Sequence, residues 1–302
     1  MIIITIWPIF ALICLGFVMA RKGFPTADFW PAAERINYFV LFPALLLNSL
    51  SKAPVRDPEV LRLGGATIVL ILLVAAGFWG LRQLRPTPAA RFGPALQGAI
   101  RFNTYLGLAV VASLTDTEGV SRAAVYLAVA VPLVNVLSVL ALTQSDGARS
   151  PGALLRPIVK NPLILACVAG IALAFLGTGL PFGTGAFLGF LAQASLPLGL
   201  LCVGAALRPA TLRLDLGTLL GNAALRLLGM PCLAALTILA FGVSGAEALI
   251  LLVFSAVPTA PTAYVLTRQL GGDGALMAGI VTVQTLLAVV TIPLVLLILG
   301  RV

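Results

Sequence analysis

Val257-Pro258-Thr259-Ala260-Pro261-Thr262-Ala263-Tyr264 interrupts an apolar stretch that runs over residues 245–267. About twenty apolar residues are what an α-helix needs to cross the hydrocarbon core of a bilayer. Each of the two prolines removes an amide donor and clashes with the preceding turn, so a continuous helix through both is not expected. Irregular backbone at membrane depth is tolerated only against protein or a water-filled cavity. The segment therefore predicts a broken membrane helix beside a polar site.

A second interruption, Arg101-Phe102-Asn103-Thr104-Tyr105-Leu106-Gly107, lies near the middle of another apolar stretch. The sequence is 60% hydrophobic and 10% charged, which excludes a soluble globular protein. We predict an all-α integral membrane protein with ten transmembrane helices, of which the fourth and ninth are broken. The ten stretches cover approximately residues 2–20, 35–51, 60–82, 92–114, 120–142, 161–179, 184–207, 214–240, 245–267 and 274–299.

The two halves of the chain resemble each other weakly. Phe42-Pro43-Ala44-Leu45-Leu46 in the second stretch matches Leu196-Pro197-Leu198-Gly199-Leu200 in the seventh, and the two interruptions occupy equivalent positions. Five helices in each half would give the halves opposite orientations, and inverted repeats of this kind are characteristic of secondary transporters. We expect a first repeat over residues 1–142, a linker over 143–160 and a second, inverted repeat over 161–302.

The basic residues predict the orientation in the membrane. With both termini on the non-cytoplasmic side, the cytoplasmic loops carry twelve Lys and Arg residues and the opposite loops carry five, as the positive-inside rule requires. The linker over residues 143–160 is then cytoplasmic. The net charge of +9 has the same cause, so the lipid bilayer and not nucleic acid is the expected partner.

The two interruptions supply the candidate binding residues. A broken helix exposes amide N–H groups and a positive dipole end, which attract anions. Arg101 would add positive charge, whereas snorkelling or bonding to helix-end carbonyls is the alternative for both Arg101 and Arg226. The candidates for substrate binding are Arg101, Asn103, Thr104, Tyr105, Gly107, Pro258, Thr259, Ala260, Pro261, Thr262 and Tyr264. The side of the site that faces the broken helices is expected to be lined by Asn37, Pro43, Asn48, Gln193 and Pro197.

Simpler explanations of these residues stay open. The prolines fit a kinked helix without a ligand, Asn103 fits an interhelical hydrogen bond, and Tyr105 and Tyr264 fit packing or anchoring at the membrane interface.

Several classes of chemistry are not expected. The chain has no histidine, its ten acidic residues fall between the stretches or near their ends, and its four cysteines show no CxxC spacing. We therefore expect no metal, no cofactor and no catalytic site. Proton and sodium coupling are disfavoured for the same reason. Sodium is not excluded, because carbonyls and amides could hold it, such as those of Asn37, Asn48, Gln97, Gln193 and Gln284.

A set of short motifs in a fixed order carries a resemblance to a known family. They are Arg35-Ile36-Asn37-Tyr38, Phe42-Pro43-Ala44-Leu45-Leu46, Asn161-Pro162, Ser195-Leu196-Pro197-Leu198, and Pro258 to Tyr264 followed by Arg268-Gln269. In their order and spacing they resemble the auxin efflux carrier family of bacterial, archaeal and plant transporters, over essentially the full length of the chain.

The resemblance implies ten helices in two inverted five-helix repeats, similar in architecture to bile-acid symporters and sodium/proton antiporters. Helices 1, 2, 6 and 7 would form a scaffold domain that pairs in a homodimer, and helices 3–5 and 8–10 would form a moving transport domain. The broken helices 4 and 9 would cross at the site, where Asn103 and Thr104 match one crossover and Pro258 to Pro261 the other.

The function implied is export of a small organic anion, a carboxylate, across a bacterial inner membrane. The transporter would be secondary active or driven by the membrane potential, and would work by an elevator-type alternating-access mechanism. The alternative is a sodium- or proton-coupled organic-acid symporter.

Overall fold

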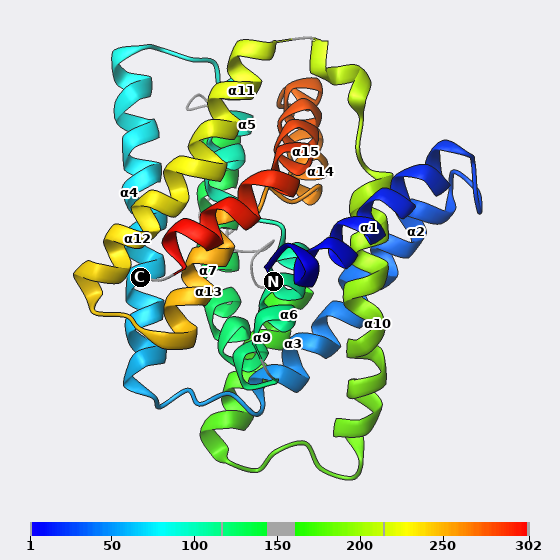
Figure 1. Ribbon diagram of the computed structural model, residues 1–302, viewed down its shortest axis with the longest axis vertical. Coiled ribbons are helices and arrows are strands. Elements are labelled where there is room, and N and C mark those ends of the chain that lie inside the picture. Colours follow the sequence, from blue (N-terminus) through cyan, green and yellow to red (C-terminus); the bar gives the residue numbers. More distant parts are fainter. Residues whose placement is uncertain (1, 116, 144–160, 214, 301–302) are drawn as a thin grey trace.

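The computed structural model describes the chain except for residues 1, 116, 144–160, 214 and 301–302, so the predicted linker lies almost wholly outside the described residues. All regular structure in the described part is helical (Figure 1). Its helices are α1 (Ile2–Arg21), α2 (Phe29–Ile36), η1 (Asn37–Leu41), α3 (Phe42–Leu50), α4 (Pro58–Leu84), α5 (Ala89–Ile100), α6 (Thr104–Leu114), α7 (Thr117–Leu142), α9 (Pro162–Leu176), α10 (Thr184–Ala205), η2 (Pro209–Arg213), α11 (Leu216–Ala224), η3 (Leu225–Gly229), α12 (Met230–Phe241), α13 (Gly245–Ala256), α14 (Thr262–Gln269) and α15 (Gly274–Leu299).

The helices confirm an all-α membrane protein. Within the described residues, six helices are long and apolar enough to cross a membrane: Ile4–Arg21, Pro58–Leu84, Glu118–Leu142, Thr184–Ala205, Leu216–Phe241 and Gly274–Leu299. Two shorter apolar helices are α9 and α13. The full arrangement of ten helices in two inverted repeats stays a prediction.

The fourth apolar stretch is broken between α5 and α6, as predicted. Arg101 has extended backbone angles, φ −78° and ψ 148°, and so does Asn103, at φ −76° and ψ 103°. No proline lies in this break. Instead Asn103 acts as the N-cap of α6, because its Oδ1 accepts a hydrogen bond from the Leu106 amide at 3.1 Å.

The ninth stretch is broken between α13 and α14, also as predicted. Val257 leaves the helix at φ −75° and ψ 149°, the region that a residue before proline prefers. Pro261 then has helical angles and stands at the N-cap of α14, a position where proline's missing amide costs nothing.

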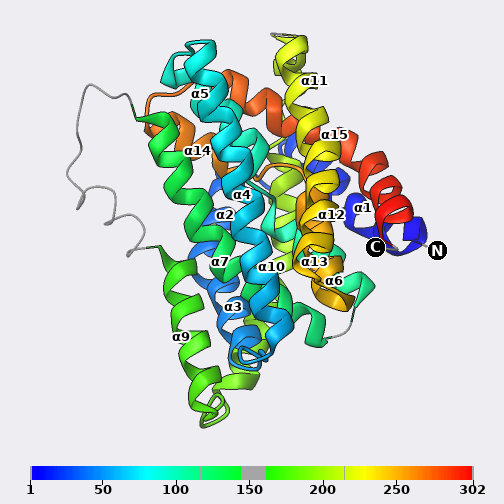
Figure 2. The ribbon, with the colours of Figure 1, turned by 90° about the vertical axis from the view of Figure 1, so that its left-hand side faces the viewer.

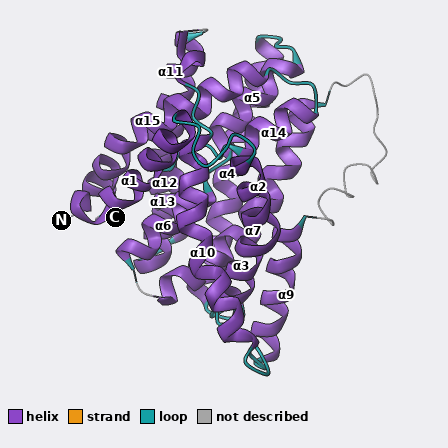
Figure 3. Ribbon diagram, turned by 90° about the vertical axis from the view of Figure 1, so that its right-hand side faces the viewer, coloured by secondary structure: helices purple, strands orange, loops and turns teal. Residues whose placement is uncertain are grey.

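The two breaks meet inside the protein, where extended backbone passes between the helix ends (Figure 3). The Asn103 amide donates to the Pro258 carbonyl oxygen at 2.8 Å. The Thr259 hydroxyl donates to the Gly98 carbonyl oxygen at 2.9 Å, and the Thr259 amide donates to Oε1 of Gln284 at 2.8 Å. Gln284 also donates to the Gly98 carbonyl oxygen from Nε2. Broken backbone at membrane depth is therefore hydrogen-bonded by protein groups.

Two π turns interrupt otherwise continuous helices, and each ends two residues before a proline. The Phe42 amide donates to the Asn37 carbonyl oxygen ahead of Pro43, and the Met230 amide donates to the Leu225 carbonyl oxygen ahead of Pro231. These are bonds to the fifth preceding residue, and the wider turn relieves the clash that a proline ring causes.

The helices pack as two groups on either side of the breaks (Figures 1 and 2). In the first, which we call the α10 group, α1 and α3 pack on α10, α9 packs on α3, and α2 leads through η1 into α3. In the second, the α7 group, α4 and α5 pack on α7, α12 packs on α13 and α4, and α11 and α14 pack on α15. From the α7 group, α6 contacts α10 and α1 as well as α7 and α13. Their identity as scaffold and transport domains stays a prediction.

Within the α10 group, α1 and α10 approach each other through two glycines. A Cβ at Gly204 would lie 2.7 Å from the Phe17 nitrogen, and one at Gly16 would lie 2.7 Å from the Leu201 Cα. These are backbone atoms, which cannot turn aside as a side chain can. The contact therefore requires residues without side chains at both positions.

We expect Gly204→Leu to force α1 and α10 apart and destabilise the protein, since overpacking costs about 1–3 kcal/mol or more. The measurement is the midpoint of thermal unfolding in detergent. Gly189→Leu is the matched control, because it lies on the same helix with no atom within 4 Å of an added Cβ. Equal midpoints for the two variants would contradict the packing described here.

Candidate substrate site

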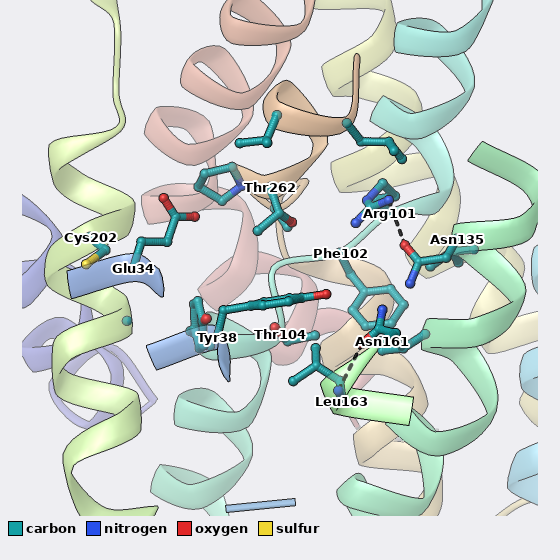
Figure 4. A pocket seen from close by; sticks show the side chains of 18 of the residues that line it. Glu34, Tyr38, Arg101, Phe102, Thr104, Asn135, Asn161, Leu163, Cys202 and Thr262 are labelled. Carbon is teal, nitrogen blue, oxygen red and sulfur yellow. Dashed lines mark hydrogen bonds between the residues drawn. The ribbon is translucent and has the colours of Figure 1, made fainter. Parts of the chain in front are cut away.

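A cavity of about 620 Å³ lies where the two breaks meet the α10 group (Figure 4). One wall comes from the first residues of α6 and α14 and from α7, and the other comes from α2, η1, α10 and the start of α9. Much of the lining is apolar. The polar side chains are those of Glu34, Arg35, Tyr38, Arg101, Thr104, Tyr105, Asn135, Asn161, Cys202, Thr262 and Gln269.

Two helices begin at the cavity, so their positive dipole ends face it. Thr104 and Tyr105 open α6, and Thr262 opens α14. The amides of these residues have no hydrogen-bond acceptor in the described part of the chain. Amides of this kind at a helix start bind anions, and the hydroxyls of Thr104 and Thr262 can add further hydrogen bonds.

Arg101 supplies a full positive charge in the same wall. Its Nη1 donates to Oδ1 of Asn135 at 2.9 Å, and Figure 4 shows the two side chains side by side. Its other guanidinium nitrogens have no acceptor among the described residues. They are therefore free to bind a carboxylate, in the paired geometry that arginine favours.

The opposite side of the cavity carries Glu34, Tyr38 and Cys202 (Figure 4). The Glu34 carboxylate forms no hydrogen bond or ion pair among the described residues. Glu34 is not among the residues predicted from sequence, because the second apolar stretch is predicted to begin at residue 35, whereas the helix begins at Phe29. Asn135 and Asn161 were also missed as lining residues.

Arg226, the second arginine deep in apolar sequence, lies away from the cavity. It is 1% exposed and donates three hydrogen bonds to carbonyl oxygens: from Nε to Val257 at 2.8 Å, from Nη1 to Ala99 at 3.1 Å and from Nη2 to Phe254 at 2.6 Å. Of the two readings left open for this residue, bonding to helix-end carbonyls is confirmed.

The candidate binding residues separate into two sets by position. Those that line the cavity are Arg101, Thr104, Tyr105, Ala260, Pro261 and Thr262. Those behind the lining are Asn103, Gly107, Pro258, Thr259 and Tyr264.

Each residue of the second set has a structural contact. Asn103 and Thr259 are fully buried and bond across the breaks. A Cβ at Gly107 would lie within 2.7 Å of the Phe254 ring, so this glycine makes room for an aromatic ring. Tyr264 lies under the guanidinium of Arg208, with 5.8 Å from its Cζ to the ring centroid.

None of the five residues expected on the opposite side lines the cavity. Asn37 is buried and joins η1 to α10, because its Nδ2 donates to the Ser195 carbonyl oxygen and its Oδ1 accepts from the Ser195 hydroxyl. Gln193 and Pro197 are exposed on α10, and Pro43 and Asn48 lie half-buried in α3. From α10 it is Gly199, Cys202 and Val203 that line the cavity.

The described residues contain no group of three or more His, Cys, Asp or Glu side chains that could hold a metal ion. What the cavity offers is positive charge and hydrogen-bond donors, in an apolar surround.

The fold is that of an all-α membrane protein with a partly polar cavity between its helices, and comparison with known proteins identifies its class. The chain belongs to the membrane transport protein family, whose model matches residues 1–296. This is the auxin efflux carrier family, so the resemblance drawn from the motifs is confirmed.

Two relatives are also described as transporters. A protein of Methanothermobacter thermautotrophicus named "Uncharacterized transporter" is 25% identical over 301 residues, which are 96% of each chain. A protein of Rhizobium meliloti named "Putative malonate transporter" is 30% identical over 217 residues, which are 67% of this chain and 66% of that one.

In a cysteine-free background, we expect Thr262→Cys to react with an anionic, water-soluble thiol reagent. Thr262 lines the cavity, whereas Thr259, three residues away, is fully buried. Thr259→Cys is therefore the matched control and should stay unmodified. Mass spectrometry of the intact protein measures both, and equal labelling of the two variants would contradict the cavity's position.

Proposed function

We propose that this protein carries a small organic anion, a dicarboxylate of malonate size, across the membrane. The single observation that supports this most is the convergence of two helix amino ends and the Arg101 guanidinium on one cavity. A substrate carboxylate would bind Arg101 and the free amides of Thr104, Tyr105 and Thr262. The name of the Rhizobium relative supports the choice of malonate as the first substrate to test.

The proposed mechanism is elevator-type alternating access. The α10 group would be the fixed scaffold, paired with a second copy in a homodimer, and the α7 group would carry the site across the membrane. The position of the cavity between the groups supports this division. Its lining includes residues from the second half of α7 and the start of α9, the two ends that flank the predicted cytoplasmic linker. With both termini outside, the cavity would open to the cytoplasm, as an exporter requires before loading.

Export of an anion needs no coupling ion. One charge that moves through a potential of about 100 mV, inside negative, gains roughly 2.3 kcal/mol.

The alternative is a coupled organic-acid symporter, and Glu34 favours a proton-coupled form. A carboxylate in an anion site can accept a proton and so reduce its repulsion of the substrate. The dependence of transport on pH and on sodium, measured in the same proteoliposomes, separates the two mechanisms.

We expect Arg101→Gln to reduce malonate uptake into proteoliposomes at least about tenfold, since a charge-assisted hydrogen bond contributes about 1.5–3 kcal/mol. Glutamine can still bond Asn135, so the fold should survive. Arg91→Gln is the control, because Arg91 forms an exposed ion pair with Asp215 outside the cavity. Undiminished uptake by Arg101→Gln, at equal protein in the vesicles, would exclude this residue from the site.

A disulfide between the two groups should stop transport by an elevator. An added Cβ at Gly199, on α10, would lie 2.7 Å from Cγ of Tyr105, on α6. We expect the double variant Gly199→Cys/Tyr105→Cys to lose uptake on oxidation and to regain it on reduction, relative to its own reduced state. A disulfide within the α10 group, from Gly170→Cys/Leu50→Cys, is the control, and it should leave uptake unchanged. Transport by fully cross-linked Gly199→Cys/Tyr105→Cys would exclude the motion.

A further inference from the structure

Arg226 takes the place of hydrogen-bond donors that the breaks remove. In a continuous helix the Phe254 carbonyl oxygen would accept from the amide of residue 258, but that residue is proline. The Ala99 carbonyl oxygen would accept from the Asn103 amide, which instead donates to Pro258. Arg226 donates to both orphaned carbonyl oxygens.

The charge of Arg226 is balanced by carbonyl dipoles. Ala99 lies in the last turn of α5 and Phe254 in the last turn of α13, so the guanidinium sits between two negative helix ends. Within the described residues Arg226 forms no salt bridge. Three carbonyl oxygens around one positive charge form a cation site.

In carriers with discontinuous helices, helix carboxyl ends and unwound carbonyls are where a coupling cation binds. We propose that Arg226 is a resident cation. It fills the carbonyl-lined place between α5 and α13 that a mobile cation would otherwise occupy, and it fixes the geometry of the two breaks without one. What this occupancy means for ion coupling rests on the proposed transport function. The occupancy of the cation site by Arg226 does not.

This makes Arg226 a positioning residue. It touches no part of the cavity, and it acts by holding the carboxyl ends of α5 and α13 together. The amino ends of α6 and α14 follow directly in the chain and line the cavity.

The test is chemical rescue of Arg226→Ala, purified in detergent without substrate. We expect its unfolding midpoint to fall by on the order of 10 °C relative to the unchanged protein. Millimolar guanidinium chloride, well below denaturing concentrations, should recover at least half of that loss. Choline chloride at the same ionic strength should recover none.

Leu227→Ala is the matched control, because Leu227 is also 1% exposed and lies in the same π turn, but it donates no side-chain hydrogen bond. It should lose stability and gain nothing from guanidinium. Failure of guanidinium to stabilise Arg226→Ala, or equal stabilisation of both variants, would overturn the proposal.

Should Arg226→Ala yield no folded protein, the unchanged protein provides a second test. Its midpoint and its malonate uptake should be equal in sodium chloride and choline chloride, because the cation place is already filled. A sodium-dependent midpoint would overturn the proposal. Absence of malonate uptake would count against the proposed substrate alone, because the stabilisation by guanidinium is measured without malonate.

Discussion

The hydrogen bond from the Asn103 amide to the Pro258 carbonyl oxygen joins the two broken helices, and much of the interior follows from it. An unsatisfied backbone group in a hydrocarbon environment costs several kcal/mol, so neither break could persist alone in lipid. The amide of Asn103 in one break supplies the donor that the carbonyl oxygen of Pro258 in the other break needs. That hydrogen bond still leaves the carbonyl oxygens of Ala99 and Phe254 without backbone donors, and Arg226 supplies those donors.

The place where the two broken helices cross therefore has a side of negative helix ends and a side of positive helix ends. The carboxyl ends of α5 and α13 share Arg226, which donates to three carbonyl oxygens and is shielded from solvent. The amino ends of α6 and α14 open on the cavity with Arg101, which has one protein acceptor, Asn135. Two arginines in similar apolar sequence therefore have different surroundings. What distinguishes them is how many of their donors the protein itself uses.

How much of the fold and of the cavity the sequence predicts depends on how far apart in the chain the interacting residues lie. The break before α14 follows from local proline chemistry and the break before α6 from a capping asparagine, so both were predictable. The π turns before Pro43 and Pro231 were not predicted, although proline marks them. Glu34, Asn135 and Arg226 could not be assigned, because their surroundings come from segments distant in the chain. Gln193 was expected at the cavity as a polar residue in an apolar stretch, and Pro197 as part of a short motif match. Neither signal fixes which face of a helix is exposed.

The distribution of polar contacts bears on how the protein could move. One π turn carries Asn37, which bonds Ser195 inside the α10 group, and the other carries Arg226, which bonds α5 and α13 inside the α7 group. Beside the cavity, Gly199 and Phe42 of the α10 group contact the ring of Tyr105 on α6. Apolar contacts have no directional bonds to break when surfaces slide, whereas buried polar bonds do. The elevator motion proposed above would therefore preserve the hydrogen bonds of Asn37 and of Arg226, and the two crossing breaks would move as one rigid unit.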